Sequence, residues 1–106
     1  DIMSPSDFKR IKMSKNEVRK LITSLIQKED AITFVKHAFD RMKERNIDIQ
    51  DVRNILESPS SFIDRDGELE NGSYRYRLGT NRMYVILSFN SDGTRLIVVT
   101  VMRRRS

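Results

Sequence analysis

The sequence contains no cysteine, only one histidine and no long apolar run. Without cysteine the chain can form neither disulfides nor thiolate metal sites, which fits a reducing compartment. No run approaches the ~20 apolar residues needed to span a bilayer, and no signal-peptide pattern opens the chain. We therefore expect no membrane insertion by this domain. Its 106 residues suffice for one core, so we predict a single domain over 1–106.

Several catalytic motifs are also missing. The chain has no pair of histidines, no His-Glu-x-x-His motif and no Walker-type glycine loop, so zinc hydrolysis and nucleotide-triphosphate chemistry lack their residues. Acidic residues are scattered, which disfavours a two-metal nuclease. Asp64, Asp66, Glu68 and Glu70 do form an acidic patch at a predicted hairpin. We interpret it as a solvated turn, with metal binding as the alternative, and we expect neither a metal nor a cofactor.

Positive charge is concentrated in the second half of the chain. The net charge is +5, and the stretch from Gly72 to Ser106 holds seven arginines against one acid, Asp92. Such a basic region favours a polyanion partner, most often nucleic acid. Plain solubility is the alternative explanation for the same charge.

Hydrophobic periodicity divides the chain into three parts. We predict a loosely ordered lead-in over 1–13, helices over 14–58 and a sheet over 61–104. The sheet region contains four period-two runs separated by short turn signals, which favours an antiparallel meander. Helices followed by strands predict an α+β fold, with the helices on one face of an antiparallel sheet of about four strands.

The helical part has clear start and stop signals. Ser14 and Glu17 form a capping box before a helix that we predict over 15–28. A second helix, over 37–45, ends near Asn46, a residue that tolerates the left-handed conformation. Between these two helices, "AITFV" is β-prone and predicts a brief extended segment.

A third helix follows the second directly. Asp48 is its predicted N-cap, and Pro59 ends it. Its predicted buried stripe consists of Ile49, Val52, Ile55 and Leu56.

Alternation assigns the strand residues to faces. Arg75 and Arg77 share one face, and Tyr74, Tyr76 and Leu78 share the other. In the last strand, alternation places Thr100 with Leu96, Val98 and Met102. Thr100 is a lone hydroxyl among apolar residues, and its simplest explanation is the preference of threonine for strands.

The second helix carries a row of polar residues. His37, Arg41 and Arg45 recur at four-residue spacing along the border of a buried stripe that includes Ala38 and Met42. Partial desolvation strengthens charges at such a border. The alternative is a set of ordinary helix pairs, Asp40 with His37 and Glu44 with Arg41.

A metal-free ribonuclease uses residue types that this chain has. In that reaction the 2′-OH of RNA attacks the adjacent phosphorus, so the protein must move protons and stabilise the phosphate. A histidine can transfer protons near neutral pH, and the forked donors of arginine match phosphate oxygens. A threonine or tyrosine hydroxyl can donate to an oxyanion.

We therefore predict one site in which His37 is the general acid/base. Arg41, Arg75, Tyr76 and Thr100 complete the catalytic set. Further RNA and phosphate contacts are assigned to Arg45, Arg77, Arg82 and Arg103. The tyrosines of "SYRYR" can stack bases or simply pack across strands. Two alternatives to an enzyme stay open: a non-catalytic RNA- or DNA-binding regulatory module that uses the same basic face, and a protein-interaction domain.

Three stretches, "HAFDRMKERNIDIQDVRNIL", "NGSYRYRLGTNRMYVILSFN" and "LIVVTVMRR", resemble a bacterial family of domains of unknown function. The resemblance covers roughly residues 32–104. Such domains look like members of the barnase–EndoU–colicin–RelE class of metal-independent toxin ribonucleases. By position, the resemblance maps the family's helix histidine and arginines, its Arg-rich strand and its last-strand hydroxyl onto His37, Arg41, Arg45, Arg75, Arg77 and Thr100.

The resemblance also implies a biological setting. It implies an endoribonuclease toxin that acts in the bacterial cytoplasm, with tRNA as one candidate RNA, and a cognate immunity or antitoxin protein of acidic character. Toxins of this class are stand-alone partners of antitoxins or C-terminal parts of contact-dependent growth inhibition proteins. Because the chain opens at Asp1 and ends in "MRRRS", we expect the second setting, with delivery into a neighbouring cell.

Overall fold

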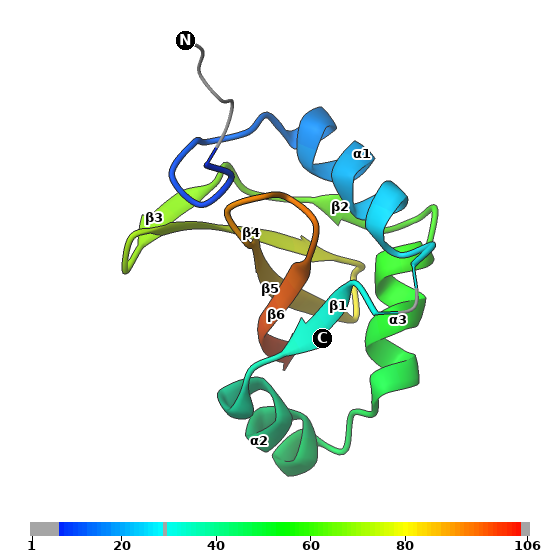
Figure 1. The fold of residues 1–106 in the computed structure, drawn as a ribbon. Coiled ribbons are helices and arrows are strands. Elements are labelled where there is room, and N and C mark those ends of the chain that lie inside the picture. Colours follow the sequence, from blue (N-terminus) through cyan, green and yellow to red (C-terminus); the bar gives the residue numbers. More distant parts are fainter. Residues whose placement is uncertain (1–6, 29, 105–106) are drawn as a thin grey trace, which may run out of the picture.

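The structure is a computed structural model that describes residues 7–28 and 30–104 (Figure 1). Over these ranges it contains three helices and six strands, and all three helices precede the last five strands. This confirms the predicted α+β class. Asp1, Pro5 and Arg105 lie outside the described residues. None of the helices in these ranges combines the length and apolar character that a membrane crossing requires.

The first helix, α1 (Lys15–Leu25), begins at the predicted capping box. The backbone N–H of Glu17 donates to Ser14 Oγ at 3.2 Å, and the N–H of Ser14 donates to Glu17 Oε1 at 2.9 Å. These two bonds satisfy donors that the first helical turn leaves without partners. The helix ends at Leu25, three residues before the predicted Lys28, because the chain turns there toward the first strand.

Two further helices follow a short strand: α2 (Lys36–Arg45) and α3 (Ile49–Glu57). Asn46 ends α2 in the left-handed conformation (φ 55°), as predicted. Asp48 caps α3 by accepting the N–H of Asp51 at 2.8 Å. The prediction that Ile49 is buried is wrong: it is 46% exposed, because it lies in the first turn, ahead of the face that meets the sheet. The buried residues of α3 are Val52, Ile55 and Leu56.

The sheet has six strands in the described residues and is mixed. Its strands are β1 (Ile32–Phe34), β2 (Phe62–Ile63), β3 (Glu68–Glu70), β4 (Ser73–Gly79), β5 (Met83–Phe89) and β6 (Leu96–Arg103). Their spatial order is β1-β6-β5-β4-β2, with β3 also paired to β4. The prediction of a purely antiparallel sheet of about four strands was therefore too simple. The segment "AITFV" supplies β1, which joins β6 in parallel, and the acidic segment supplies β3.

The acidic patch lies at a hairpin, as predicted, but Glu68–Glu70 form strand β3, paired with β4, rather than a solvated turn. Asn71 (φ 53°) and Gly72 (φ 79°) connect the two strands in left-handed conformations. An Asn-Gly pair is a strong signal for such a two-residue hairpin turn, although the turn at Asn71-Gly72 was not predicted. Glu68 and Glu70 consequently lie opposite Arg75 and Ser73 in a regular ladder.

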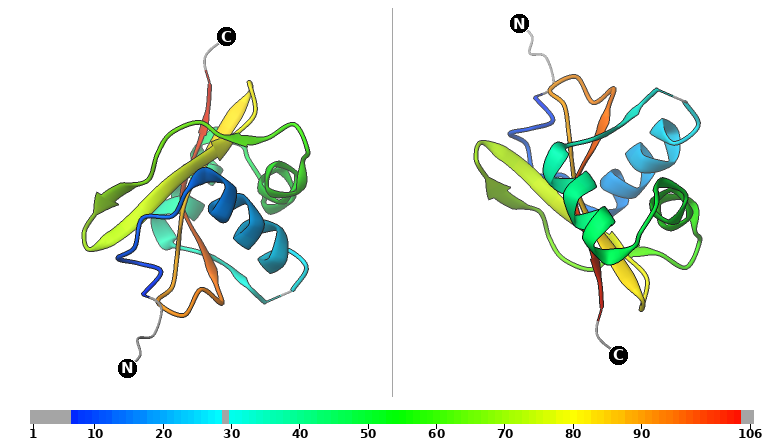
Figure 2. Two further views of the ribbon diagram at one scale, coloured as in Figure 1. Left: turned by 90° about the horizontal axis from the view of Figure 1, so that it is seen from above. Right: turned by 90° about the horizontal axis from the view of Figure 1, so that it is seen from below.

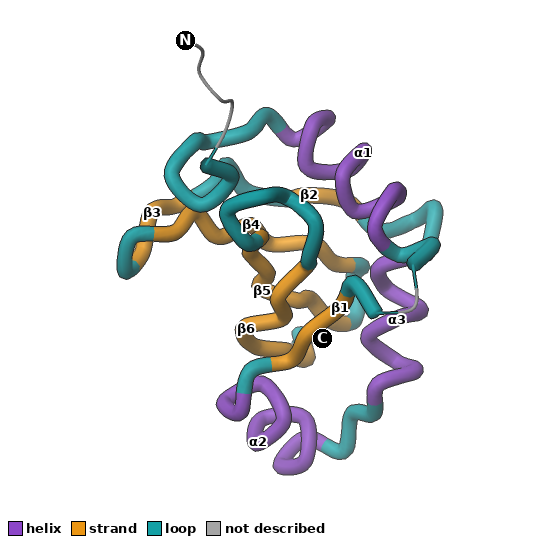
Figure 3. The backbone as a smooth tube through the Cα atoms, in the orientation of Figure 1, coloured by secondary structure: helices purple, strands orange, loops and turns teal. Residues whose placement is uncertain are grey.

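Helices α1 and α3 pack on one face of the sheet and contact each other there (Figure 2). Between them lies the core, where Val18, Ile22 and Leu56 meet apolar residues of the central strands. Helix α2 stands apart from α1 and α3 (Figure 3), but its buried residues Ala38 and Met42 belong to the same core.

Helix α2 runs along β6 where β1 ends. The N–H of Val35 donates to Val98 O at 3.2 Å, which starts α2 beside the middle of β6. At the other end, the Arg103 guanidinium donates to Arg45 O at 3.2 Å and to Asn46 O at 3.1 Å. A cation is stabilised at the carbonyl end of a helix. These contacts fix the helix that carries His37 against the strand that carries Thr100.

Residues 7–13, the described part of the predicted lead-in, form neither a helix nor a strand. Hydrogen bonds nevertheless tie them to the sheet region: the N–H of Phe8 donates to Ser91 O at 3.0 Å, and that of Tyr74 donates to Lys9 O at 2.7 Å. The side chain of Met13 is buried in the core.

Candidate active site

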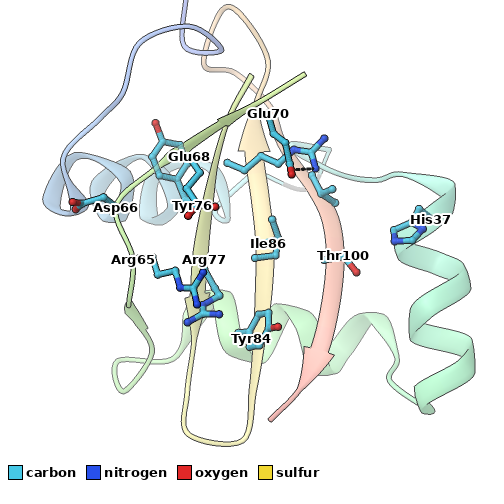
Figure 4. A pocket seen from close by; sticks show the side chains of 12 residues that line it. His37, Arg65, Asp66, Glu68, Glu70, Tyr76, Arg77, Tyr84, Ile86 and Thr100 are labelled. Atoms are coloured by element: carbon cyan, nitrogen blue, oxygen red, sulfur yellow. Dashed lines mark hydrogen bonds and ion pairs between the residues drawn. The ribbon is translucent and has the colours of Figure 1, made fainter. Parts of the chain in front are cut away.

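A pocket of about 340 Å³ opens on the sheet face that α1 and α3 leave uncovered (Figure 4). Its walls come from α2, the segment before β3, and strands β3 to β6. The lining residues are His37, Arg65, Asp66, Glu68, Glu70, Arg75, Tyr76, Arg77, Tyr84, Ile86, Val99 and Thr100.

A β-bulge in β6 puts Thr100 in this pocket. Leu87 pairs with Val98 and Ile86 pairs with Thr100, so Val99 is an extra residue between two regular pairs. The bulge inverts the alternation beyond it: Val101 is buried while Thr100 turns to the open face. The prediction that Thr100 shares a face with Leu96 and Val98 is therefore wrong. Bulges often re-aim a side chain in this way beside functional sites.

His37 lies in the first turn of α2, and its side chain is exposed at the mouth of the pocket. In Figure 4 the imidazole of His37 and the hydroxyl of Thr100 point toward one another across the gap between α2 and β6. Asp40 does not pair with His37; its carboxylate lies 3.3 Å from Lys36 Nζ instead.

Arg77 is held in place by a carboxylate. Its Nε donates to Asp64 Oδ1 at 2.7 Å, and Arg104 Nη2 donates to the other oxygen of Asp64 at 2.6 Å. The three side chains are only 13–24% exposed. Burial alone would raise the pKa of Asp64, but hydrogen bonds from the two arginines outweigh it, so the pKa of this carboxyl lies below its ordinary value. The hydrogen bond to Asp64 raises the pKa of Arg77, which stays charged.

Tyr84 lies against both of these arginines. The guanidinium carbons of Arg77 and Arg104 are 4.7 Å and 5.0 Å from the centre of its ring. Such cation–π contacts restrict the guanidinium planes further. Arg104 is also anchored through Nε, which donates to Thr80 O at 2.7 Å. Asp64, Arg77, Arg104 and Tyr84 form one connected unit, which we call the arginine cluster.

Carboxylates balance the arginines along the pocket wall. Arg75 Nη1 donates to Glu70 Oε1 at 2.7 Å. The lining as a whole contains three arginines and three carboxylates. In Figure 4 the labelled carboxylates are spread across the pocket above Arg77, and Tyr84 lies below it. The carboxylates that line the pocket therefore lie on the side away from Tyr84.

Tyr76 contributes the side of its ring to the pocket, but its hydroxyl is used elsewhere. The hydroxyl accepts the N–H of Met13 at 3.0 Å and donates to Ile11 O at 3.4 Å. The ring is 2% exposed, and burial raises the pKa of the hydroxyl. This geometry makes Tyr76 a residue that anchors the N-terminal segment.

Of the predicted site residues, the structure brings His37, Arg75, Tyr76, Arg77 and Thr100 to this pocket. The others lie outside it. Arg41 pairs with Glu44 at 2.9 Å, and Arg45 Nη1 lies 3.9 Å from the same residue. Arg82 is exposed in the turn between β4 and β5, and Arg103 binds the end of α2.

Sequence reasoning did not assign several lining residues to the site, notably Arg65, Tyr84 and Ile86. Alternation offered a signal for the last two, since Tyr84 and Ile86 alternate with the buried Val85 and Leu87. No such signal exists for Arg65, which reaches the pocket from an irregular segment.

The acidic segment raised metal binding as an alternative. Over residues 7–28 and 30–104, no three histidine or carboxylate side chains are grouped so that they could hold a metal ion. Two of the carboxylates in this segment, those of Asp64 and Glu70, bind arginines instead.

No curated protein and no solved structure matches the chain. One family model matches residues 34–103, a segment that begins in β1, ends in β6 and contains every residue that lines the pocket. The matched segment covers about two thirds of the chain, and the chain belongs to the family described as "Domain of unknown function (DUF4258)".

Proposed function

We propose that the protein is a metal-independent endoribonuclease that acts as a bacterial toxin. The observation that carries the proposal is the pocket, where His37 from α2 faces Thr100 from β6 beside two arginines of β4. The sequence predicted that these four residues share a site, and they come from three different elements.

The reaction forms a bond between the 2′-oxygen and phosphorus and breaks the bond from phosphorus to the 5′-oxygen. Its products are a 2′,3′-cyclic phosphate and a free 5′-hydroxyl. One group must accept the 2′-proton and another must donate a proton to the leaving oxygen. His37 supplies one of them, and the carboxylates of Glu68 and Glu70 in the same pocket are candidates for the other.

The remaining groups act on the phosphate. Asp64 accepts a hydrogen bond from the Nε of Arg77, and this contact fixes the direction of the two terminal nitrogens of the guanidinium. Two parallel N–H donors of this kind match the oxygens of a phosphate. The hydroxyl of Thr100 donates to an oxygen that gains charge in the transition state. Arg75 binds Glu70 in the free protein, so a phosphate must compete with that carboxylate.

The wider setting follows from the same proposal. The substrate is RNA, with tRNA as the first class to test, and cleavage takes place in the cytoplasm of a target bacterium. A cognate immunity or antitoxin protein of acidic character would neutralise the toxin by covering its basic face. Delivery as part of a larger secreted protein belongs to this proposal as well.

The test compares the wild type with His37→Ala on RNA in the presence of EDTA. We expect the variant to lose cleavage by about 10²–10⁴-fold, the usual contribution of a general acid or base, while it keeps its fold and most of its RNA affinity. Lys36→Ala is the matched control, because Lys36 is its neighbour on α2, is 89% exposed and does not line the pocket. Mapping of the product ends should show a 2′,3′-cyclic phosphate.

One observation favours a second candidate, a non-catalytic RNA- or DNA-binding module. Arg75 and Arg77 are both bound to carboxylates, while Arg82 is exposed outside the pocket. Such a module would bind nucleic acid with strong salt dependence, and neither the wild type nor His37→Ala would cleave RNA.

A further inference from the structure

The arginine cluster contains more positive charge than its carboxylate can neutralise. Arg77 and Arg104 share the single carboxylate of Asp64, one oxygen each. The unit therefore retains an excess of one positive charge. Charges this far out of water are screened less than those on an open surface, so the excess attracts an anion more strongly than a mobile surface arginine would.

The cluster is also rigid before any ligand binds. Arg104 is fixed by Asp64 and by the carbonyl of Thr80, and the ring of Tyr84 supports both guanidinium groups. A preorganised donor loses little conformational freedom on binding, which improves affinity. Its two guanidiniums offer more N–H donors than Asp64 and Thr80 accept.

The position of the cluster relative to the proposed reacting group is set by the strand register. Ile86 pairs with Thr100, and Tyr84 lies two residues from Ile86 along β5. Two residues of a strand span about 7 Å. Neighbouring phosphates of a single-stranded nucleic acid can span a distance of this size. Glu68 and Glu70 lie on the side of the pocket away from Tyr84, and Arg75 binds Glu70 there.

We propose that Arg104 of the arginine cluster forms a second phosphate subsite, which binds the phosphate next to the one that Arg77 holds for cleavage. This inference rests on the proposed function and specifies its substrate: a single strand with at least two phosphates, whose backbone leaves the pocket over Tyr84. Arg82 lies where that backbone would continue, since the N–H of Arg104 donates to its carbonyl at 2.7 Å.

The test uses short substrates with a single ribose, which fixes the cleaved bond. A dinucleotide contains only the reacting phosphate, and two trinucleotides add a second phosphate on the 5′ or the 3′ side. We expect Arg104→Ala to leave kcat/KM on the dinucleotide unchanged and to lower it about tenfold on one trinucleotide, the size typical of a charge-assisted contact. Arg104→Lys, which keeps the charge without the fork, should recover part of the loss. Arg10→Ala is the control for lost charge, because Arg10 is 79% exposed and does not line the pocket.

A second measurement does not depend on cleavage. All-deoxy trinucleotides serve as probes for equilibrium binding over a range of salt concentrations. Loss of one phosphate contact should reduce the slope of log K against log salt by about 0.7 for Arg104→Ala but not for Arg10→Ala. Equal losses on dinucleotide and trinucleotides, or an unchanged salt slope, would overturn the subsite. If no RNA is cleaved by the wild type, the proposed function fails, and the salt slope still decides whether the subsite exists.

Discussion

The same strands form both faces of the central sheet, but one face is buried in the core and the other lines the pocket. On the covered face, Leu78, Val85 and Leu87 are fully buried against α1 and α3. On the open face, Arg77, Ile86 and Thr100 line the pocket. The covered face stabilises the fold by removing apolar area from water. The open face buries little apolar area and contributes little to this stabilisation. Its residues can therefore be polar and can bind a ligand.

The difference in stability between the two faces can be tested by truncating two neighbouring side chains of β5. Leu87→Ala should lower the free energy of unfolding by about 3 kcal/mol, because it removes a fully buried side chain and leaves a cavity. Ile86→Ala, one residue away on the open face, should cost less than about 1.5 kcal/mol. Denaturant unfolding of both variants measures the difference, and similar losses would contradict the assignment of the faces.

The arginine cluster is the one part of the open face expected to affect stability. Asp64→Asn leaves two guanidiniums without their counter-charge and should cost about 2 kcal/mol at neutral pH. The pKa of Asp64 is lowered in the folded state. Its contribution is therefore fully present above the ordinary value of 3.8 and is lost as the pH falls below that value toward the folded pKa.

Melting curves of the wild type and Asp64→Asn between pH 7 and pH 2 test this point. Since asparagine does not titrate, the gap between the two proteins should close as the acid protonates Asp64. A gap that does not narrow as the pH falls below 3.8 would mean that packing, rather than charge, explains the loss.

The smallest effect on stability is expected at the bulge. Thr100→Val keeps the shape and the strand preference of the residue, so the melting temperature should change by no more than a few degrees. Cleavage of RNA should fall about tenfold or more because the hydroxyl is lost. Thr100→Ser, which keeps the hydroxyl, is the matched control. Equal activity of the valine and serine variants would remove Thr100 from the mechanism.

Local signals in the sequence predicted the helix starts well. The capping box at Ser14 and the cap at Asp48 form as predicted because each depends on residues only three apart. Alternation also placed Arg77 and Tyr76 on opposite faces of β4, as burial in the structure confirms. Such features depend on neighbours in the chain, and neighbours are visible in the sequence.

The candidate site was only partly predictable for the opposite reason. The row of Arg41 and Arg45 continues from His37 on the helix, but α2 lies along β6 so that only its first turn reaches the pocket. Tyr84 enters the site through contacts with Arg77 and Arg104, which are distant in sequence. No local pattern encodes those contacts.

By itself the sequence determined the α+β class, the helix caps, the strands of the meander and the residue types available for metal-free chemistry, because caps, period and composition are local properties. The tertiary structure alone decided three things: the parallel pairing of β1 with β6, the position of α2 beside β6, and the bulge at Val99 that turns Thr100 toward His37. Each of them depends on which strand a segment meets and in what register, and that is settled only when the chain packs.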